Sequence, residues 1–164
     1  MSYDMTSLGL PAEITDKVEF EPVEELILRI LRDNLPNSHI GTLLELDRTG
    51  IDYSILVRRI PGLGAGDNKW INYHGISVHV YTKDPDGDEK GALISDAVRV
   101  ILRDAAHERV WYPDLGGLTR VRMTLEPVRK TDWATAEGPV QFADLPTGEW
   151  RYETRYAVWV RRPY

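Results

Sequence analysis

Apolar residues recur along the chain with two different periods, and these periods predict its secondary structure. Between residues 23 and 31 they follow the i, i+3, i+4, i+7 spacing of an amphipathic helix, which Pro22 opens and Pro36 ends. A second helical pattern runs from about Asp86 to Ala106. Its expected buried stripe consists of Ile94, Ala97, Val98, Ile101 and Ala105, widened by Leu93, Val100 and Leu102.

Four further segments alternate between apolar and polar residues, and this alternation predicts strands. The segments are residues 53–60, 71–82, 119–128 and 151–162. In the second segment, one face is expected to carry Ile76, Val78 and Val80, and the other Ser77, His79 and Tyr81. In the third, Val121, Met123 and Leu125 are expected to oppose Arg120, Arg122 and Thr124.

The elements follow one another as helix, strand, strand, helix, strand, strand. This order predicts an α+β fold in which two helices cover one face of a four-stranded, mainly antiparallel sheet. Residues 21–164 are expected to form one such domain, behind a flexible arm of residues 1–20. A long loop is expected at residues 129–150 and a break in the sheet at residues 61–68. Residues 37–50 fit either a short strand or a turn of helix.

The charge of the chain is unevenly distributed and argues against a DNA-binding regulator. Residues 1–50 hold ten of the 26 acids and four of the 20 bases, a net charge of −6. Residues 51–164 hold sixteen of each and are neutral overall. Tight binding of nucleic acid requires an excess of basic residues that neutralises phosphates. No stretch approaches the roughly 20 apolar residues that a membrane span needs, and the chain has no cysteine for a disulfide or a thiolate metal site.

The acidic segment from Asp84 to Asp88 is best interpreted as a joint between a strand and a helix. A calcium loop counted from Asp84 would need Gly at its sixth position and Glu at its twelfth, where Glu89 and Ser95 stand. The segment also lacks the Gly-Lys-Ser/Thr ending of a phosphate loop. Its Pro-Asp-Gly sequence is typical of a turn, and Asp86 or Asp88 is expected to cap the helix.

No other motif predicts catalysis, a metal or a cofactor. The glycines of residues 62–67 alternate and precede a strand, so they do not match a dinucleotide-binding loop. His74 and His79 are five residues apart and would point to opposite faces of one regular strand, where they could not share a metal without a bulge. The remaining histidines are His39 and His107, and no serine lies in a nucleophile motif.

Arginine and tryptophan residues on the strands are the strongest candidates for a functional surface. If the helices cover one face, the other face would be basic and partly aromatic. One interpretation is a solvated face with ion pairs to Glu153 and Glu126. The other is a protein–protein interface, which the five Trp and eight Tyr beside only two Phe favour. The candidate interface residues are Arg58, Arg59, Trp70, Arg120, Arg122, Arg151, Arg155 and Trp159.

Several of these segments together resemble the tail terminator proteins of long-tailed bacteriophages, most closely those of phages that infect actinobacteria. The similar features are "LVRRIPG" (56–62), a D-x-x-W lead into a strand at Asp67, "ISVHVYT" (76–82) and the helical "AVRVIL" (97–102). The first helix, "EELILRILRDNLP", and the ending "RYETRYAVWVRRP" also resemble this family. The resemblance extends over about residues 20–163.

The resemblance implies a structural virion protein without catalytic residues, cofactor or metal. Proteins of this family form a ring, typically a hexamer, on the head-proximal end of the tail tube. The ring stops tube growth and joins the tail to the head connector, after assembly in the host cytoplasm. Expected partners are other copies of the chain, the tail tube protein and the head–tail connector, with genomic DNA passing through without specific binding and no membrane involved.

Two alternatives remain open from the sequence. Another neck or head-completion protein would have a similar size and fold. A small α+β enzyme or ligand-binding domain would instead use His79, Tyr81 and an arginine, and it would need a concave pocket with converging polar groups.

Overall fold

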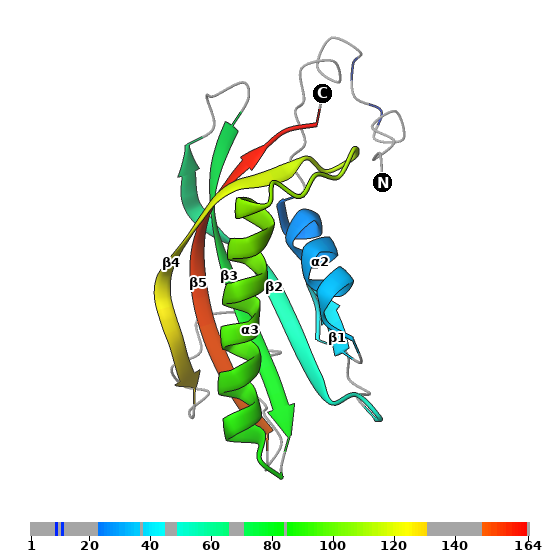
Figure 1. The fold of residues 1–164 in the computed structure, drawn as a ribbon, viewed down its shortest axis with the longest axis vertical. Helices are drawn as coiled ribbons and strands as arrows, with labels where there is room; N and C mark the ends of the chain where they lie inside the picture. The colour runs from blue at the N-terminus through cyan, green and yellow to red at the C-terminus, as the bar shows by residue number, and fades with distance from the viewer. Residues whose placement is uncertain are drawn as a thin grey trace.

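The fold belongs to the α+β class that the sequence predicts (Figure 1). The computed structural model describes residues 9, 11, 23–36, 38–44, 49–65, 71–83, 85–130 and 149–163, without the side chains of 63–65. The described helices are α2 (Val23–Asn34) and α3 (Gly87–His107). The described strands are β1 (Ser38–Gly41), β2 (Tyr53–Ala65), β3 (Ile71–Lys83), β4 (Gly117–Lys130) and β5 (Glu149–Arg161). They form a mixed, mostly antiparallel sheet in the order β1-β2-β3-β5-β4.

The prediction of four strands was wrong, because the ambiguous segment after α2 contains a fifth. β1 pairs parallel with β2, with Ile40 opposite Ile55. The Arg32 side chain fixes this short strand to α2, since its Nε and Nη2 donate to the Ile40 carbonyl over 3.0 and 2.7 Å. A strand of four residues shows too few alternations for its period to be recognised.

β2 is longer than predicted, because it continues through the segment expected to break it. Its pairing with β3 runs regularly from Tyr53 to Arg59, shifts, and resumes at Gly64. A bulge of this kind allows a strand to pass through residues that interrupt regular pairing. The predicted arm, apart from residues 9 and 11, and residues 131–148 of the predicted long loop lie outside the described residues.

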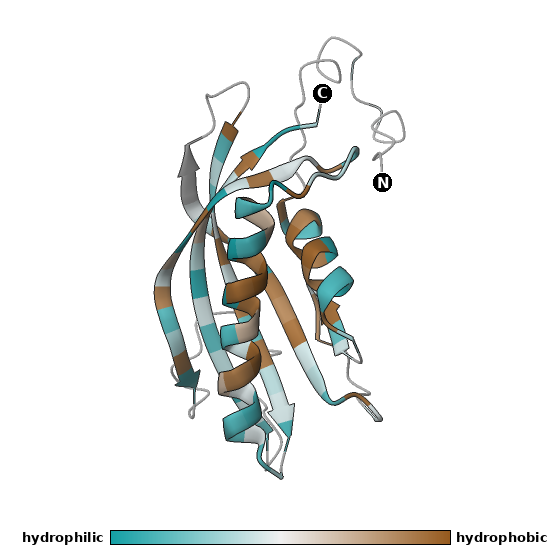
Figure 2. Cartoon of the chain, in the orientation of Figure 1, coloured by the Kyte–Doolittle hydropathy of each residue, from teal (hydrophilic) through white to brown (hydrophobic). Residues whose placement is uncertain are grey.

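One hydrophobic core joins both helices to the same face of the sheet. Figure 2 shows hydrophobic residues along α2 and in the middle of β2, and Figure 1 shows α2 and α3 in front of the sheet. The predicted inward residues of β3, Ile76, Val78 and Val80, are all buried in this core. Buried residues of the other elements in the core include Leu26, Ile27, Ile30, Leu31, Ile55, Val57, Val98, Leu102, Tyr156 and Val158.

α3 is rotated about its axis relative to the prediction. Its buried residues are Gly87, Gly91, Ser95, Val98, Leu102 and Ala105. Leu93, predicted to widen the buried stripe, is 65% exposed, and Ile94 and Ile101 contact the core only from its flank. The cause is the close approach of the helix to β5. A Cβ at Gly91 would lie 2.6 Å from the Tyr152 ring, so this turn of α3 faces the sheet with glycine instead of leucine.

The joint before α3 has the predicted architecture but not the predicted cap. Asp86 is the N-cap residue in a left-handed conformation, with φ of 64°, and its side chain makes no capping hydrogen bond. Asp88, two residues further on, accepts a hydrogen bond from the Tyr152 hydroxyl over 2.5 Å and another from Arg129 over 3.2 Å. Asp88 therefore ties the start of α3 to β4 and β5.

Candidate functional site: the helix-free face of the sheet

Strand register places most of the predicted interface residues on the face opposite the helices, here called the helix-free face. Arg58 on β2 lies opposite Ser77, which lies opposite Arg155 on β5. Arg151 shares this face because it is four residues before Arg155 on the same strand. On β4, Arg120 pairs with Trp159, and Arg122 shares its face.

Two predicted interface residues do not belong to this group. Arg59 follows Arg58 directly and pairs with Ile76, a core residue, so it lies on the helix side of β2. Its backbone N–H donates to Glu24 of α2 over 2.7 Å. Trp70 lies outside the described residues. The β4 prediction also needs correction at Leu125, because a register shift after Met123 pairs Leu125 with Arg155 on the helix-free face.

Half of the helix-free face is buried, which the sequence did not predict. Arg151 is 1% exposed and Glu153 4% exposed, and Tyr81 and Leu56 form a small second apolar cluster there. The Glu153 carboxylate lies 2.7 Å from Arg155 Nε, 3.4 Å from Lys130 Nζ and 3.9 Å from Arg151 Nη2. The interpretation as a face with ion pairs is thus confirmed for Glu153, but Glu153 and Arg151 are buried instead of solvated, and only Arg155 and Lys130 are partly exposed. We call these four residues, together with His79, which pairs with Glu153 across β3 and β5, the Glu153 cluster.

The pKa values of this cluster follow from burial and from its excess of cations. Burial, followed by the charge of Arg151, lowers the pKa of His79 to about 4. Burial alone would raise the pKa of Glu153, but the hydrogen bond from Arg155 and the neighbouring cations bring the pKa below its usual value. At neutral pH the cluster therefore contains a neutral imidazole and a charged carboxylate.

Stability is expected to fall as the pH drops from 6.5 to about 4, because the unfolded chain then binds a proton at His79 that the folded chain excludes. The full loss in the free energy of unfolding from this one group is about 3 kcal/mol. The loss from Glu153 begins lower, as pH falls toward and through its depressed pKa. Urea unfolding of wild type and His79→Gln across this range measures the first effect.

The His79→Gln variant should lose most of the slope between pH 6.5 and 4, whatever its stability at pH 7. The matched control is His107→Gln, since His107 is exposed at the end of α3. This control should keep the wild-type slope. Equal slopes in wild type and His79→Gln would contradict the assignment of a buried neutral His79.

A second group of arginine and aromatic side chains lies near the end of β5, with its arginines exposed and Tyr73 and Trp159 half-buried. The Arg120 guanidinium lies 4.9 Å from the Trp159 ring centroid, and the Tyr73 and Trp159 rings are 5.0 Å apart. Arg161, two residues beyond Trp159, lies 6.0 Å from the Trp111 ring centroid. We define the arginine–aromatic patch as Tyr73, Trp111, Arg120, Arg122, Trp159 and Arg161.

Sequence reasoning missed Trp111, Arg161 and Tyr73 as members of this patch. Arg161 lies two residues after Trp159 on β5 and so has the same phase, and Tyr73 on β3 lies opposite Trp159. The alternation of both strands therefore contained the signal. Trp111 follows the end of α3 and belongs to no periodic segment, and only the fold brings it over Arg161. The contacts of the Arg120 and Arg161 guanidinium groups with the Trp159 and Trp111 rings favour this arrangement by about 0.5–1 kcal/mol each.

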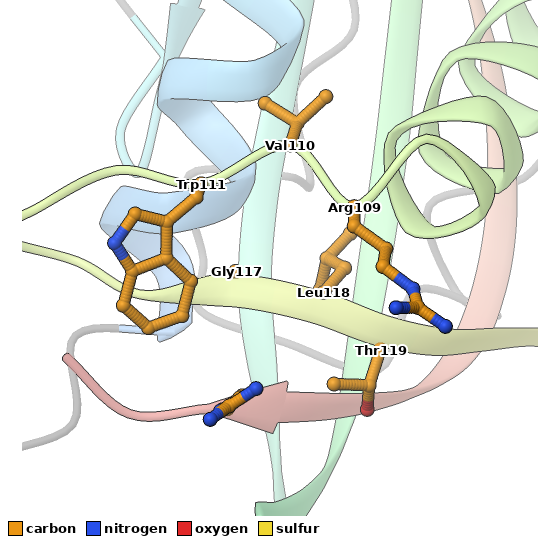
Figure 3. Close-up of a pocket in the computed structure, with 7 residues that line it drawn as sticks. Arg109, Val110, Trp111, Gly117, Leu118 and Thr119 are labelled. Atoms are coloured by element: carbon orange, nitrogen blue, oxygen red, sulfur yellow. The ribbon is translucent and has the colours of Figure 1, made fainter.

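A groove of about 590 Å³ lies at one end of the patch (Figure 3). It is lined by Arg109, Val110, Trp111, Gly117, Leu118, Thr119 and Arg161. Figure 3 shows the Trp111 indole beside Gly117 and the Arg109 guanidinium beside Thr119. The groove is therefore bordered by two cationic groups and an aromatic face, with no carboxylate among its lining residues.

The groove's backbone is held by tight local contacts. A Cβ at Gly117 would lie 2.5 Å from the Val110 carbonyl oxygen, so only glycine permits the two segments to approach this closely. The backbone N–H groups of Tyr112 and Gly116 each donate to the other residue's carbonyl over 2.8 Å. The Tyr112 hydroxyl donates to Asp33 of α2 over 2.7 Å. Burial and this hydrogen bond raise the pKa of Tyr112 to about 12. The segment between α3 and β4 is thus fixed to α2.

The His, Asp and Glu side chains of the described residues include no group of three or more arranged to hold a metal ion. Neither α2 nor α3 has the length and apolar content of a membrane-spanning helix.

Comparisons with known proteins do not identify a family for this fold and patch. No family model matches the chain, and a comparison with curated proteins gives no match either. Membership in the tail terminator family remains a prediction from the sequence.

Proposed function

We propose that this chain is a structural phage assembly protein of the tail terminator type. It forms a ring, in the resembled family typically a hexamer, that caps the head-proximal end of the tail tube and joins it to the head connector. The observation that carries the proposal is the arginine–aromatic patch. Arg and Trp are the side chains most enriched among the residues that dominate binding energy at protein interfaces.

A ring built from one kind of chain requires two different contact surfaces on each copy, because the contacts are head-to-tail. The arginine–aromatic patch supplies a cationic surface, with Arg120, Arg122 and Arg161 all exposed. The acidic first third of the chain, with a net charge of −6 over residues 1–50, supplies the complementary charge.

The edge of the sheet favours contacts through side chains over contacts through strand pairing. β4 is an edge strand, and its pairing with β5 shifts register at three places. It also carries Pro127 and exposed Arg120 and Arg122. Bulges, proline and charge on an edge strand oppose the addition of another strand. Neighbouring copies would therefore meet the patch itself.

The overall charge agrees with a ring that DNA crosses. Tight binding of DNA follows from the neutralisation of many phosphates by basic residues. The chain has a net charge of −6, so the proposed ring would allow the genome to pass without holding it. In this proposal the virion is the site of action, the tail tube protein and the head connector are the partners, and no cofactor, metal or membrane takes part.

One observation favours a different class of function, an enzyme or ligand-binding domain. His79 has a strongly lowered pKa, and perturbed ionisation is common at active sites. His79, Tyr81 and Arg151 are all buried, however. A substrate would reach them only if covering residues moved, so we favour the assembly proposal. Another neck or head-completion protein would use the same patch, and ring formation on the tail tube distinguishes the two.

Charge reversal on the patch tests the proposal. The double variant Arg120→Glu and Arg122→Glu should keep the wild-type melting temperature, because both side chains are exposed. It should lose ring formation and yield few joined particles when supplied to a phage lacking the wild-type protein. Particle yield and electron microscopy of the purified variant are the measurements.

The matched control is Arg103→Glu, an exposed arginine on α3 whose Nε lies 3.2 Å from Asp104. This variant should assemble like wild type. Normal particle yield from the Arg120 and Arg122 double variant would remove the patch from the interface and with it the main support for the proposal.

A further inference from the structure

The groove beside the arginine–aromatic patch has the chemistry of a carboxylate site. Arg109 and Arg161 border it with two guanidinium groups, which match a carboxylate in charge and in hydrogen-bond geometry. Trp111, 38% exposed, and the buried Leu118 provide an apolar surface next to them. A carboxylate attached to an apolar stem would place its charge between the guanidinium groups and its stem against the indole.

The groove also exists before a partner binds. Arg109 adopts a left-handed backbone conformation with φ of 55°, and Gly116, at φ of 81°, brings its segment against the Arg161 carbonyl. The Val110 N–H donates to the Ala105 carbonyl over 3.0 Å, which fixes the chain as it leaves α3. A preformed site of this kind loses little conformational entropy on binding.

The chain itself contains a segment of complementary charge. Six acids and one base lie between residues 13 and 25, so this acidic stretch holds more than half of the acids of the first 50 residues. The groove is open along one side, which suits a side chain presented by another protein surface better than a small molecule enclosed on all sides.

We propose that the groove formed by Arg109, Trp111 and Arg161 binds a carboxylate from the acidic stretch, residues 13–25, of a neighbouring copy of this chain. This inference rests on the proposed ring and names the contact that closes it. The groove then acts as the anchor of the head-to-tail interface, with the rest of the arginine–aromatic patch around it.

The test measures self-association of the full chain by analytical ultracentrifugation, at low and high salt, with tail tube protein present and absent. The groove variant, Arg109→Glu with Arg161→Glu, should weaken association about 30-fold or more, the effect of losing a dominant interface contact. Trp111→Ala should weaken it in the same direction. Arg103→Glu is the control and should change association less than about threefold.

A charge exchange identifies the occupant of the groove. A second variant carries Asp16→Lys, Glu19→Lys and Glu21→Lys. Each variant alone should associate poorly, and an equal mixture of this variant with the groove variant should recover association, because the new glutamates face the new lysines. Thermal melting of every variant checks folding. If the groove double variant melts early, Arg109→Glu alone takes its place, since that side chain is exposed.

Each outcome has a distinct meaning. Recovery in the mixture supports the inference. Wild-type association of the groove variant overturns it and leaves the ring proposal standing. Association that the groove variant loses but the mixture fails to recover excludes the acidic stretch as the occupant. A wild-type chain that stays monomeric in every condition contradicts the ring proposal, and the inference fails with it.

Discussion

Leu102→Asp is expected to abolish folding of the domain. Leu102 is 0% exposed in the middle of α3 and belongs to the core shared by both helices and the sheet. The substitution places a carboxylate in the hydrophobic core, which costs well over about 4 kcal/mol. Small domains have a total stability of about 5–15 kcal/mol. Urea unfolding followed by circular dichroism should show little or no folded baseline.

The same helix offers a matched control, Leu93→Asp. Leu93 is 65% exposed and lies on the same helix as Leu102, so the two variants carry the same substitution and differ in the burial of the replaced side chain. The free energy of unfolding of this variant should lie within about 0.5 kcal/mol of the wild-type value. Loss of folding in Leu93→Asp, or normal unfolding of Leu102→Asp, would contradict the rotation of α3 described here.

Glu153→Gln is expected to be the most destabilising change among the polar residues. The carboxylate of Glu153 is the acceptor for Arg155 and lies within 4 Å of Lys130 and Arg151 as well. Removing its charge leaves the buried Arg151 and the partly exposed Arg155 and Lys130 without that compensation, while the side-chain shape is kept. Breaking a buried ion pair in this way costs about 3–5 kcal/mol. The denaturant midpoint at neutral pH measures the loss.

Glu126→Gln serves as its control, because Glu126 is exposed on β4 and the chemical change is the same. The free energy of unfolding of this variant should change by less than about 0.5 kcal/mol. If Glu153→Gln were equally mild, the Glu153 cluster would not stabilise the helix-free face of the sheet.

The long periodic segments were predictable from the sequence, and the failures have physical causes. α2 and β3 were predicted within two residues, since each repeats its pattern over several turns or alternations. β1 was missed because four residues carry almost no periodic signal. The orientation of α3 was wrong because Gly91, which has no hydrophobic side chain, decides which side approaches β5.

The candidate site was predictable only where strand alternation decides it. Alternation placed Arg155 and Trp159 on one face, and the register confirms that they share it. It could not reveal that Arg151 would be buried beside Glu153 while Arg120 stays exposed, because burial depends on neighbouring segments. Trp111 was out of reach for the same reason, since its contact with Arg161 joins two segments 50 positions apart.

The mass of the wild-type particle in solution tests the central claim most directly. Purified protein should be measured by analytical ultracentrifugation over a range of concentrations, alone and with tail tube protein, and the same samples imaged by electron microscopy. The account predicts closed annuli of identical subunits, present with the wild-type chain and absent when Arg120 and Arg122 are reversed to glutamate. A chain that remains monomeric at high concentration, even beside the tail tube protein, would contradict it.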